Sequence, residues 1–144
     1  LAHKGAFKKA IDALAAKYKN KKVQYVVGVE ARGFIFGAAL AYKLNAGFIP
    51  IRKKGKLPYK TKSVTYQLEY GTDTLEMHED AIFPNARVLV VDDLLATGGT
   101  VKAVVDLLTH QKADVIGIAF LIELGFLDGK SKLDGFPVHS LIQY

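Results

Sequence analysis

Residues 88–100 read VLVVDDLLATGGT and combine an apolar run, two acids and a glycine-containing turn. Val88–Val91 is a short, β-branched-rich run, typical of a parallel strand that is buried on both faces. Asp92 and Asp93 follow at its carboxyl end, where open α/β sheets bind their ligands. Ala96–Thr100 then supplies small residues, backbone N–H groups and hydroxyls just before a helical pattern, a helix start suited to a phosphate.

The acid pair and the glycine-containing turn predict a ligand with two parts, one that carries hydroxyls and one that carries a phosphate. Paired carboxylates accept hydrogen bonds from vicinal hydroxyls, and the turn receives a phosphate monoester, so a ribose 5-phosphate fits both. A buried strand that ends in a solvated acidic turn would also contain adjacent aspartates. That alternative does not explain the sequence Thr97-Gly98-Gly99-Thr100 at this offset from the acids.

Length and composition limit the classes of protein to which the chain can belong. The chain has 144 residues, of which 50% are hydrophobic and 24% charged, and this suits a single domain with a buried core. There is no cysteine for a disulfide or a thiolate metal site, and the apolar runs are too short to span a bilayer. We therefore expect a cytoplasmic protein without a membrane partner. The net charge of +6 is spread out and lacks interleaved aromatics, which favours a polyanionic small substrate over nucleic acid.

Hydrophobic periodicity predicts alternating helices and strands. Predicted helices cover residues 4–19, Gly33–Asn45 and Gly98–His110, and predicted strands cover Tyr25–Val29, Phe48–Ile51, Val88–Val91, Val115–Ile122 and Val138–Ile142. Thr65–Tyr70 and Thr74–His78, separated by Gly71-Thr72-Asp73, are predicted to form a hairpin within a flexible loop over about residues 53–79. This order predicts a single α/β domain over residues 1–144, with a mainly parallel, twisted sheet flanked by helices.

A second strand-to-helix turn, Gly28–Gly33, offers backbone donors and the Arg32 guanidinium to a phosphate. Glu30 stands where a dinucleotide-binding GxGxxG sequence has its second glycine, and no lysine follows Gly98-Gly99-Thr100 as in a Walker A loop. A dinucleotide or P-loop site is therefore disfavoured. An ordinary turn with a surface arginine remains the alternative.

A basic segment, Arg52-Lys53-Lys54-Gly55-Lys56, directly follows the predicted strand Phe48–Ile51. Such a segment is usually a solvated loop. Here its predicted place is the edge of the sheet that also carries Asp92 and the Arg32 turn, where it could neutralise a departing polyanion. The four histidines are scattered without metal-ligand spacing, and neither HExxH nor GxSxG occurs.

Three segments together resemble the type I phosphoribosyltransferase family: Val88–Thr100, Glu30–Gly33 and Tyr66–Gly71. They stand in the family's order, and the resemblance covers nearly the whole chain. The third segment, YQLEYG, is similar to the catalytic loop of those members that use adenine as acceptor. A lone exposed glutamate in a hairpin would be the alternative for Glu69.

The resemblance implies the type I phosphoribosyltransferase fold and transfer of ribosyl 5-phosphate from phosphoribosyl pyrophosphate (PRPP) to adenine, giving AMP and pyrophosphate in purine salvage. It implies Glu69, Asp92 and Asp93 as catalytic residues, Glu69 acting near adenine N7 and the aspartates on the ribose and its cationic carbon. Ala96, Thr97, Gly98, Gly99 and Thr100 would hold the 5-phosphate. Pyrophosphate would meet Glu30, Ala31, Arg32, Arg52, Lys53 and Lys56, and the adenine would meet Arg32, Phe34, Tyr70 and Leu94.

The resemblance also implies Mg²⁺ held mainly by PRPP and pyrophosphate oxygens rather than by protein side chains, a homodimer, and a cis peptide bond in the Glu30–Gly33 turn. Family members carry a further N-terminal segment that covers the adenine with an arginine, and we expect this chain, which starts at Leu1, to lack it. Two alternatives stay open: a non-catalytic regulator of the same fold that senses PRPP, and an enzyme of this fold for another base.

Overall fold

A computed structural model describes residues 2–68 and 70–144 of the chain. The helices are α1 (Lys4–Tyr18), α2 (Gly33–Leu44) and α3 (Gly99–His110), with short 3-10 helices η1 (Gly125–Leu127) and η2 (Gly129–Leu133). The strands are β1 (Tyr25–Val29), β2 (Gly47–Lys53), β3 (Thr61–Gln67), β4 (Thr72–His78), β5 (Arg87–Leu95), β6 (Asp114–Glu123) and β7 (Val138–Gln143). Within the described residues, no helix is both long and apolar enough to cross a membrane.

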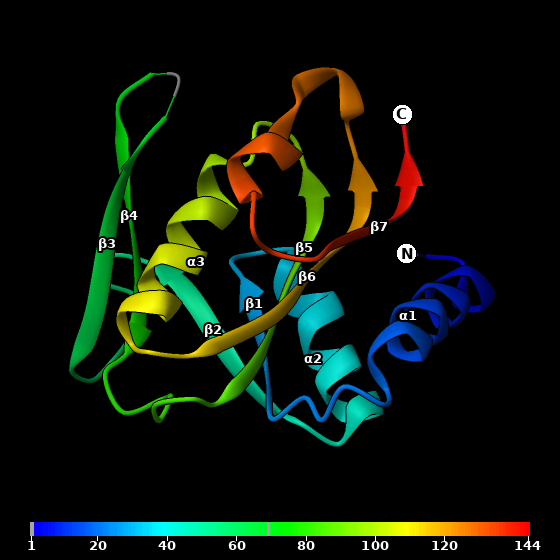
Figure 1. The fold of residues 1–144 in the computed structure, drawn as a ribbon, viewed down its shortest axis with the longest axis horizontal. Coiled ribbons are helices and arrows are strands. Elements are labelled where there is room, and N and C mark those ends of the chain that lie inside the picture. The colour runs from blue at the N-terminus through cyan, green and yellow to red at the C-terminus, as the bar shows by residue number, and fades with distance from the viewer. Residues whose placement is uncertain (1, 69) are drawn as a thin grey trace.

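The strands form one seven-stranded sheet in the order β3-β4-β2-β1-β5-β6-β7. The five strands from β2 to β7 pair in parallel, whereas β4 pairs antiparallel with both β2 and β3. The predicted α/β fold with a mainly parallel sheet is therefore confirmed. In Figure 1 the β3–β4 hairpin stands at the left beside α3, while α1 and α2 lie at the lower right.

Helices cover both faces of the parallel part, because its strands are apolar on both sides. Val90 and Ile118 pack in one core cluster with α3 and with Leu75 and Met77 of β4. Leu89 and Val91 alternate with them and pack in a second cluster with α1 and α2. This double burial explains why the strands read as continuous apolar runs rather than as alternating patterns.

Two predicted boundaries were wrong. The predicted strand Val88–Val91 continues as β5 to Leu95, so Asp92 and Asp93 lie inside the last part of the strand. In the hairpin, β3 begins at Thr61 rather than Thr65, and Gln67 pairs with Thr72, so Thr72 and Asp73 belong to β4 instead of the turn. The alternating Thr, Ser and Lys residues of Thr61–Gln67 form an edge strand with little burial, and a search for apolar alternation misses such a strand.

Candidate active site

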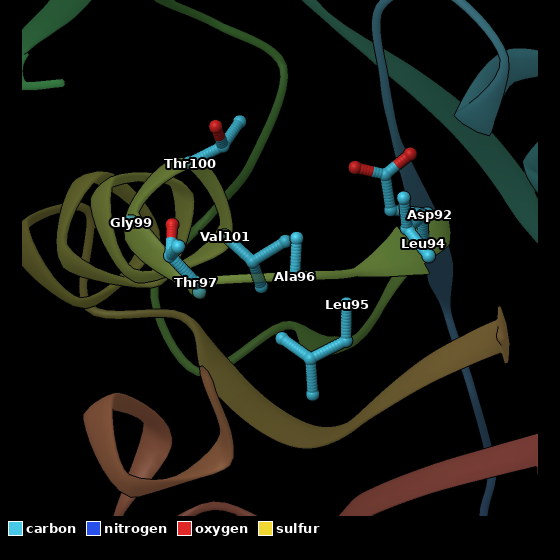
Figure 2. A pocket seen from close by; sticks show the side chains of 9 residues that line it. Asp92, Leu94, Leu95, Ala96, Thr97, Gly99, Thr100 and Val101 are labelled. Carbon is cyan, nitrogen blue, oxygen red and sulfur yellow. The ribbon is translucent and has the colours of Figure 1, made fainter. Parts of the chain in front are cut away.

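The phosphate-type turn lies between β5 and α3, as predicted. Its residues Ala96–Thr100, with Asp92, line a hollow of about 90 Å³. Figure 2 shows the Asp92 carboxylate at the strand end and the hydroxyl-bearing side chains of Thr97 and Thr100 around the start of the helix. Gly98 caps α3 without a side-chain hydrogen bond, so the first N–H groups of the helix remain donors for a ligand.

Two glycines allow this turn to form. Gly98 has φ +77°, and a Cβ atom there would lie 2.3 Å from the carbonyl oxygen of Gly129. A Cβ on Gly129 would lie 2.1 Å from the carbonyl oxygen of Ala96. The start of η2 therefore packs directly on the turn and fixes its shape. Sequence reasoning missed Gly129, because an isolated glycine outside any motif carries no sign of a contact over such a distance along the chain.

The two adjacent acids differ in their surroundings. An oxygen of Asp92 accepts a hydrogen bond from the Asp93 backbone N–H at 2.8 Å, and the Asp93 carboxylate forms an ion pair with Arg32. Burial, with a further contribution from the charge of Asp93, raises the pKa of Asp92 to about 7. Asp92 therefore changes its charge near neutral pH, which makes it responsive to a positive charge on a ligand.

The Arg32 turn joins β1 to α2 beside these acids. Glu30, Ala31 and Arg32 line a second hollow of about 210 Å³ together with Asp92, Asp93, Leu94 and Thr100. The peptide bond between Glu30 and Ala31 is cis, as the resemblance implied. At Gly33 a Cβ atom would lie 2.9 Å from Oδ1 of Asp92. A glycine at this position lets the start of α2 approach the acid closely.

The predicted basic loop lies next to this turn, and three of its four cations, Arg52, Lys53 and Lys56, are paired with acids. Lys56 Nζ lies 2.7 Å from one oxygen of Glu30, and the Lys53 N–H donates to the other at 2.8 Å. Lys53 Nζ lies 3.1 Å from Asp73, and Arg52 Nε lies 3.7 Å from Glu30. At this last distance Arg52 and Glu30 form an ion pair but no hydrogen bond. The buried Arg52 Nε has no hydrogen-bond partner among residues 2–68 and 70–144.

Glu30 and Glu76 hold the basic loop from two sides. Burial tends to raise the pKa of Glu30, but the Lys56 ammonium and the Lys53 N–H outweigh it, so the net pKa is lowered. Glu76, on β4, is buried and accepts the Gly55 N–H at 3.0 Å. Glu30 was predicted from the sequence as a pyrophosphate contact, whereas Glu76 was missed, because the pairing of Glu76 with Arg52 depends on the register of β2 with β4.

The hairpin brings a third hollow, of about 450 Å³, next to the turn. Gln67 and Leu68 line it from the hairpin, Thr97, Gly99 and Thr100 from the turn, and Leu127 and Lys132 from η1 and η2. The Tyr66 hydroxyl lies 3.4 Å from that of Thr100, so the hairpin leans on the start of α3. Glu69, the predicted acid, lies outside the described residues.

The residues predicted for adenine are not all together. Arg32 and Leu94 line the second hollow, and Leu94 also lines the first. Tyr70 is 90% exposed near the hairpin tip, away from the lining of these hollows. Phe34 packs edge-on against Phe48, with ring centres 5.9 Å apart, and lines none of the three hollows. Contacts of Phe34 and Tyr70 with a base therefore stay predictions.

Comparisons with known proteins agree with this geometry. The phosphoribosyl transferase domain family matches residues 1–134. An adenine phosphoribosyltransferase of Brachyspira hyodysenteriae is 57% identical over the whole chain, which covers 85% of that relative. The crystal structure of an adenine phosphoribosyltransferase from Thermoanaerobacter pseudethanolicus is 51% identical with a TM-score of 0.96, over 100% of this chain and 84% of that one. The Saccharomyces cerevisiae enzyme, solved with adenine and an imino-altritol bisphosphate, is 42% identical with a TM-score of 0.92, over 97% and 81% of the two chains.

Proposed function

The chain belongs to the phosphoribosyl transferase family and, within it, to the adenine phosphoribosyltransferases, and from this membership we propose how its residues perform the reaction. The reaction transfers ribosyl 5-phosphate from PRPP to adenine and gives AMP and pyrophosphate. One observation carries the assignment of residues: the acid pair lies between two hollows, one at the helix start and one at the Arg32 turn, and these hollows share Asp92, Leu94 and Thr100.

The first hollow suits the ribose 5-phosphate. Ala96–Thr100 would bind the phosphate through N–H groups at the start of α3 and through the Thr97 and Thr100 hydroxyls. Asp92 and Asp93, directly before the turn, would accept hydrogen bonds from the ribose hydroxyls. As the bond from C1 of the ribose to pyrophosphate breaks, that carbon becomes cationic, and nearby carboxylates stabilise the developing charge. A positive charge also favours the ionised form of Asp92, whose pKa is about 7 without a ligand.

The second hollow suits the pyrophosphate, which leaves with the electron pair of the broken bond. The backbone of Glu30-Ala31-Arg32 and the Arg32 guanidinium would meet its oxygens. Arg52, Lys53 and Lys56 stand on the adjoining loop. Arg52 would act on the polyanion through its charge, because its Nε is buried and lies 3.7 Å from Glu30.

Mg²⁺ belongs to the same proposal as an ion that arrives with the substrate. Among the described residues no three His, Cys, Asp or Glu side chains converge on a metal site. Mg²⁺ usually takes one or two carboxylates together with substrate phosphates, so pyrophosphate and ribose oxygens close to Asp92 and Asp93 form a suitable donor set. When bound, the ion would neutralise charge on the leaving pyrophosphate.

Adenine would approach the ribose carbon from the side of Leu94, with N9 forming the new bond while the one proton of the imidazole ring passes from N7 to the Glu69 carboxylate. We assign Glu69 to share a proton with N7, because the imidazole ring becomes positive as the bond forms. This assignment rests on the resemblance of Tyr66–Gly71, since Glu69 lies outside the described residues. General acid-base help of this kind is typically worth about 10²- to 10⁴-fold in rate.

Glu69→Gln tests this role and keeps the size of the side chain. We expect kcat to fall by about 10²-fold or more, whereas the KM for PRPP changes by less than about threefold, since the lost interaction belongs to the transition state. Glu79→Gln, on an exposed glutamate just after the hairpin, is the matched control and should leave both constants unchanged. An unaltered kcat in Glu69→Gln removes that residue from the mechanism.

Two alternative functions would give different results in an assay of PRPP binding and turnover. A PRPP-sensing regulator would bind PRPP without turnover, and an enzyme for another base would release pyrophosphate with that base. The paired basic loop favours turnover, because it adjoins the place proposed for the leaving group. Incubation with PRPP, Mg²⁺ and single free bases, followed by measurement of pyrophosphate, separates the three functions. Release with adenine alone supports our proposal, and binding without release under every condition supports the regulator.

We extend the proposal to a homodimer in the cytoplasm. Ile35 and Tyr42 of α2 are 47% and 90% exposed, and large apolar side chains of this kind favour an interface. The location follows from the substrate, because the highly charged PRPP does not cross a bilayer unaided. Sedimentation of the purified protein tests the dimer, and a species of 15.7 kDa at micromolar concentration would contradict it.

A further inference from the structure

The phosphate turn carries no positive charge of its own. Residues 94–101 read LLATGGTV, without an ionisable side chain, and the two residues before them are aspartates. A phosphate monoester carries a charge of about −1.5 to −2 at neutral pH. Ribose 5-phosphate would therefore sit beside like charges, with only backbone N–H groups and the helix dipole to offset them.

Among residues 2–68 and 70–144, Lys132 is the one cation that lines the first or the third hollow, the two that hold most of the turn. The third hollow is bounded by Thr97, Gly99 and Thr100 on one side and by Lys132 on the other. No carboxylate of the described residues forms a salt bridge with Lys132, whereas Lys102, on the first turns of α3, is paired with Asp106.

The segment that carries Lys132 is fixed to the turn at both of its ends. Gly129, at the start of η2, packs so closely on the turn that a Cβ there would lie 2.1 Å from the Ala96 carbonyl oxygen. Leu133, at its end, is 1% exposed and belongs to the core cluster with α3. Because η2 has only five residues, these two anchors hold the backbone of Lys132 beside the turn while its ammonium stays free to move.

We propose that Lys132 binds the 5-phosphate of PRPP and AMP and supplies the charge that the turn lacks. The inference rests on the proposed function, since it assumes that the turn receives the phosphate. The third hollow shares Thr97, Gly99 and Thr100 with the first, so the ammonium would reach the outer phosphate oxygens from the side of the third hollow. The N–H groups of the turn would hold the inner oxygens. Lys132 would then be a binding residue for the phosphate end of the substrate, with no part in the bond changes at the ribose carbon.

Lys132→Met tests the proposal, because methionine keeps much of the side-chain length and removes the charge. We expect binding of ribose 5-phosphate, measured by calorimetry, to weaken by about 10- to 100-fold, as for loss of one hydrogen bond to a charged group. Pyrophosphate, the probe of the opposite end of the site, should bind within about twofold of the unsubstituted protein. In turnover, the KM for PRPP should rise with kcat nearly unchanged.

Two further variants make the result specific. Lys130→Met removes an exposed lysine two residues away on the same 3-10 helix, outside the lining of the hollow, and should bind like the unsubstituted protein. Lys132→Arg should retain most of the affinity. The inference is overturned if Lys132→Met binds ribose 5-phosphate as tightly as the unsubstituted protein, or if Lys130→Met loses as much affinity as Lys132→Met. Either result leaves the proposed function in place. Failure of the unsubstituted protein to bind ribose 5-phosphate overturns the proposed function and the inference with it.

Discussion

Asp92→Asn is expected to make the folded protein more stable at neutral and alkaline pH. Asp92 loses its proton near pH 7 in the folded chain and near pH 3.8, its ordinary value, when unfolded. Between these values the folded state holds a proton that the unfolded state has released. The free energy of unfolding therefore falls as pH rises from about 4 to 7, and this loss is complete above pH 7.

The size of the effect follows from the same two values. A pKa difference of about 3, at roughly 1.4 kcal/mol for each unit, corresponds to about 4 kcal/mol. The charges of Asp93 and Arg32 are coupled to that of Asp92, so we expect a measured gain of about 2 to 4 kcal/mol at pH 8. Asparagine keeps an oxygen that accepts the Asp93 N–H, so the substitution removes the buried charge and leaves this hydrogen bond in place.

Urea unfolding of both proteins at pH 4, 6 and 8 measures the prediction. The difference in free energy of unfolding should be near zero at pH 4 and grow toward pH 8, while turnover at pH 8 should fall as the carboxylate is lost from the ribose site. Asp134→Asn, an exposed aspartate outside the site, is the control and should change stability by less than about 0.5 kcal/mol. A difference that does not vary with pH, or a variant less stable at pH 8, would refute the argument.

Two other substitutions test the geometry around the acids. Glu30→Gln should lower the free energy of unfolding by about 1 to 3 kcal/mol at pH 7, since it removes a charge that is hydrogen-bonded to the basic loop. The lowered pKa of Glu30 means that this stability is present above pH 4.5 and is lost as pH falls further, so acid unfolding of the two proteins should converge. Gly33→Ala should lower both stability, by about 1 to 3 kcal/mol, and kcat, because its Cβ would lie 2.9 Å from Asp92. Thermal unfolding and steady-state rates check it, and an alanine variant with full activity would contradict the close contact.

The sequence predicted those parts of the site that depend on neighbouring residues along the chain. The run Val88–Val91 followed by Asp92-Asp93 is enough to place two acids at a strand end, and Thr97–Thr100 is enough to begin a helix at a phosphate turn. The hydrophobic periodicity predicted α1, α2, α3 and the five parallel strands, and the apolar signal is strongest in β1, β5 and β6, which are the most deeply buried.

The site residues that the sequence did not predict depend on contacts between segments that are distant along the chain. Glu76 meets Gly55 only because β4 pairs antiparallel with the end of β2, and no local pattern specifies that pairing. Gly129 and Lys132 lie in a short 3-10 segment without periodicity, and their value comes from packing against a turn about 30 residues earlier in the chain. Small or polar residues in loops are common at solvated positions and at functional ones, so the residue type alone does not tell the two apart.

The pairing of the basic loop has a consequence for the kinetics of association. Among the described residues, Arg32, Arg52, Lys53 and Lys56 face Glu30, Asp73 and Asp93 as ion-pair partners, so four positive charges meet three negative ones. This ion-paired cluster, at the place proposed for the leaving group, thus has a net charge of only +1, whereas the whole chain has a net charge of +6. The paired residues themselves therefore exert little long-range attraction on a polyanion, and any steering of PRPP that weakens with ionic strength would come from the other charges of the chain.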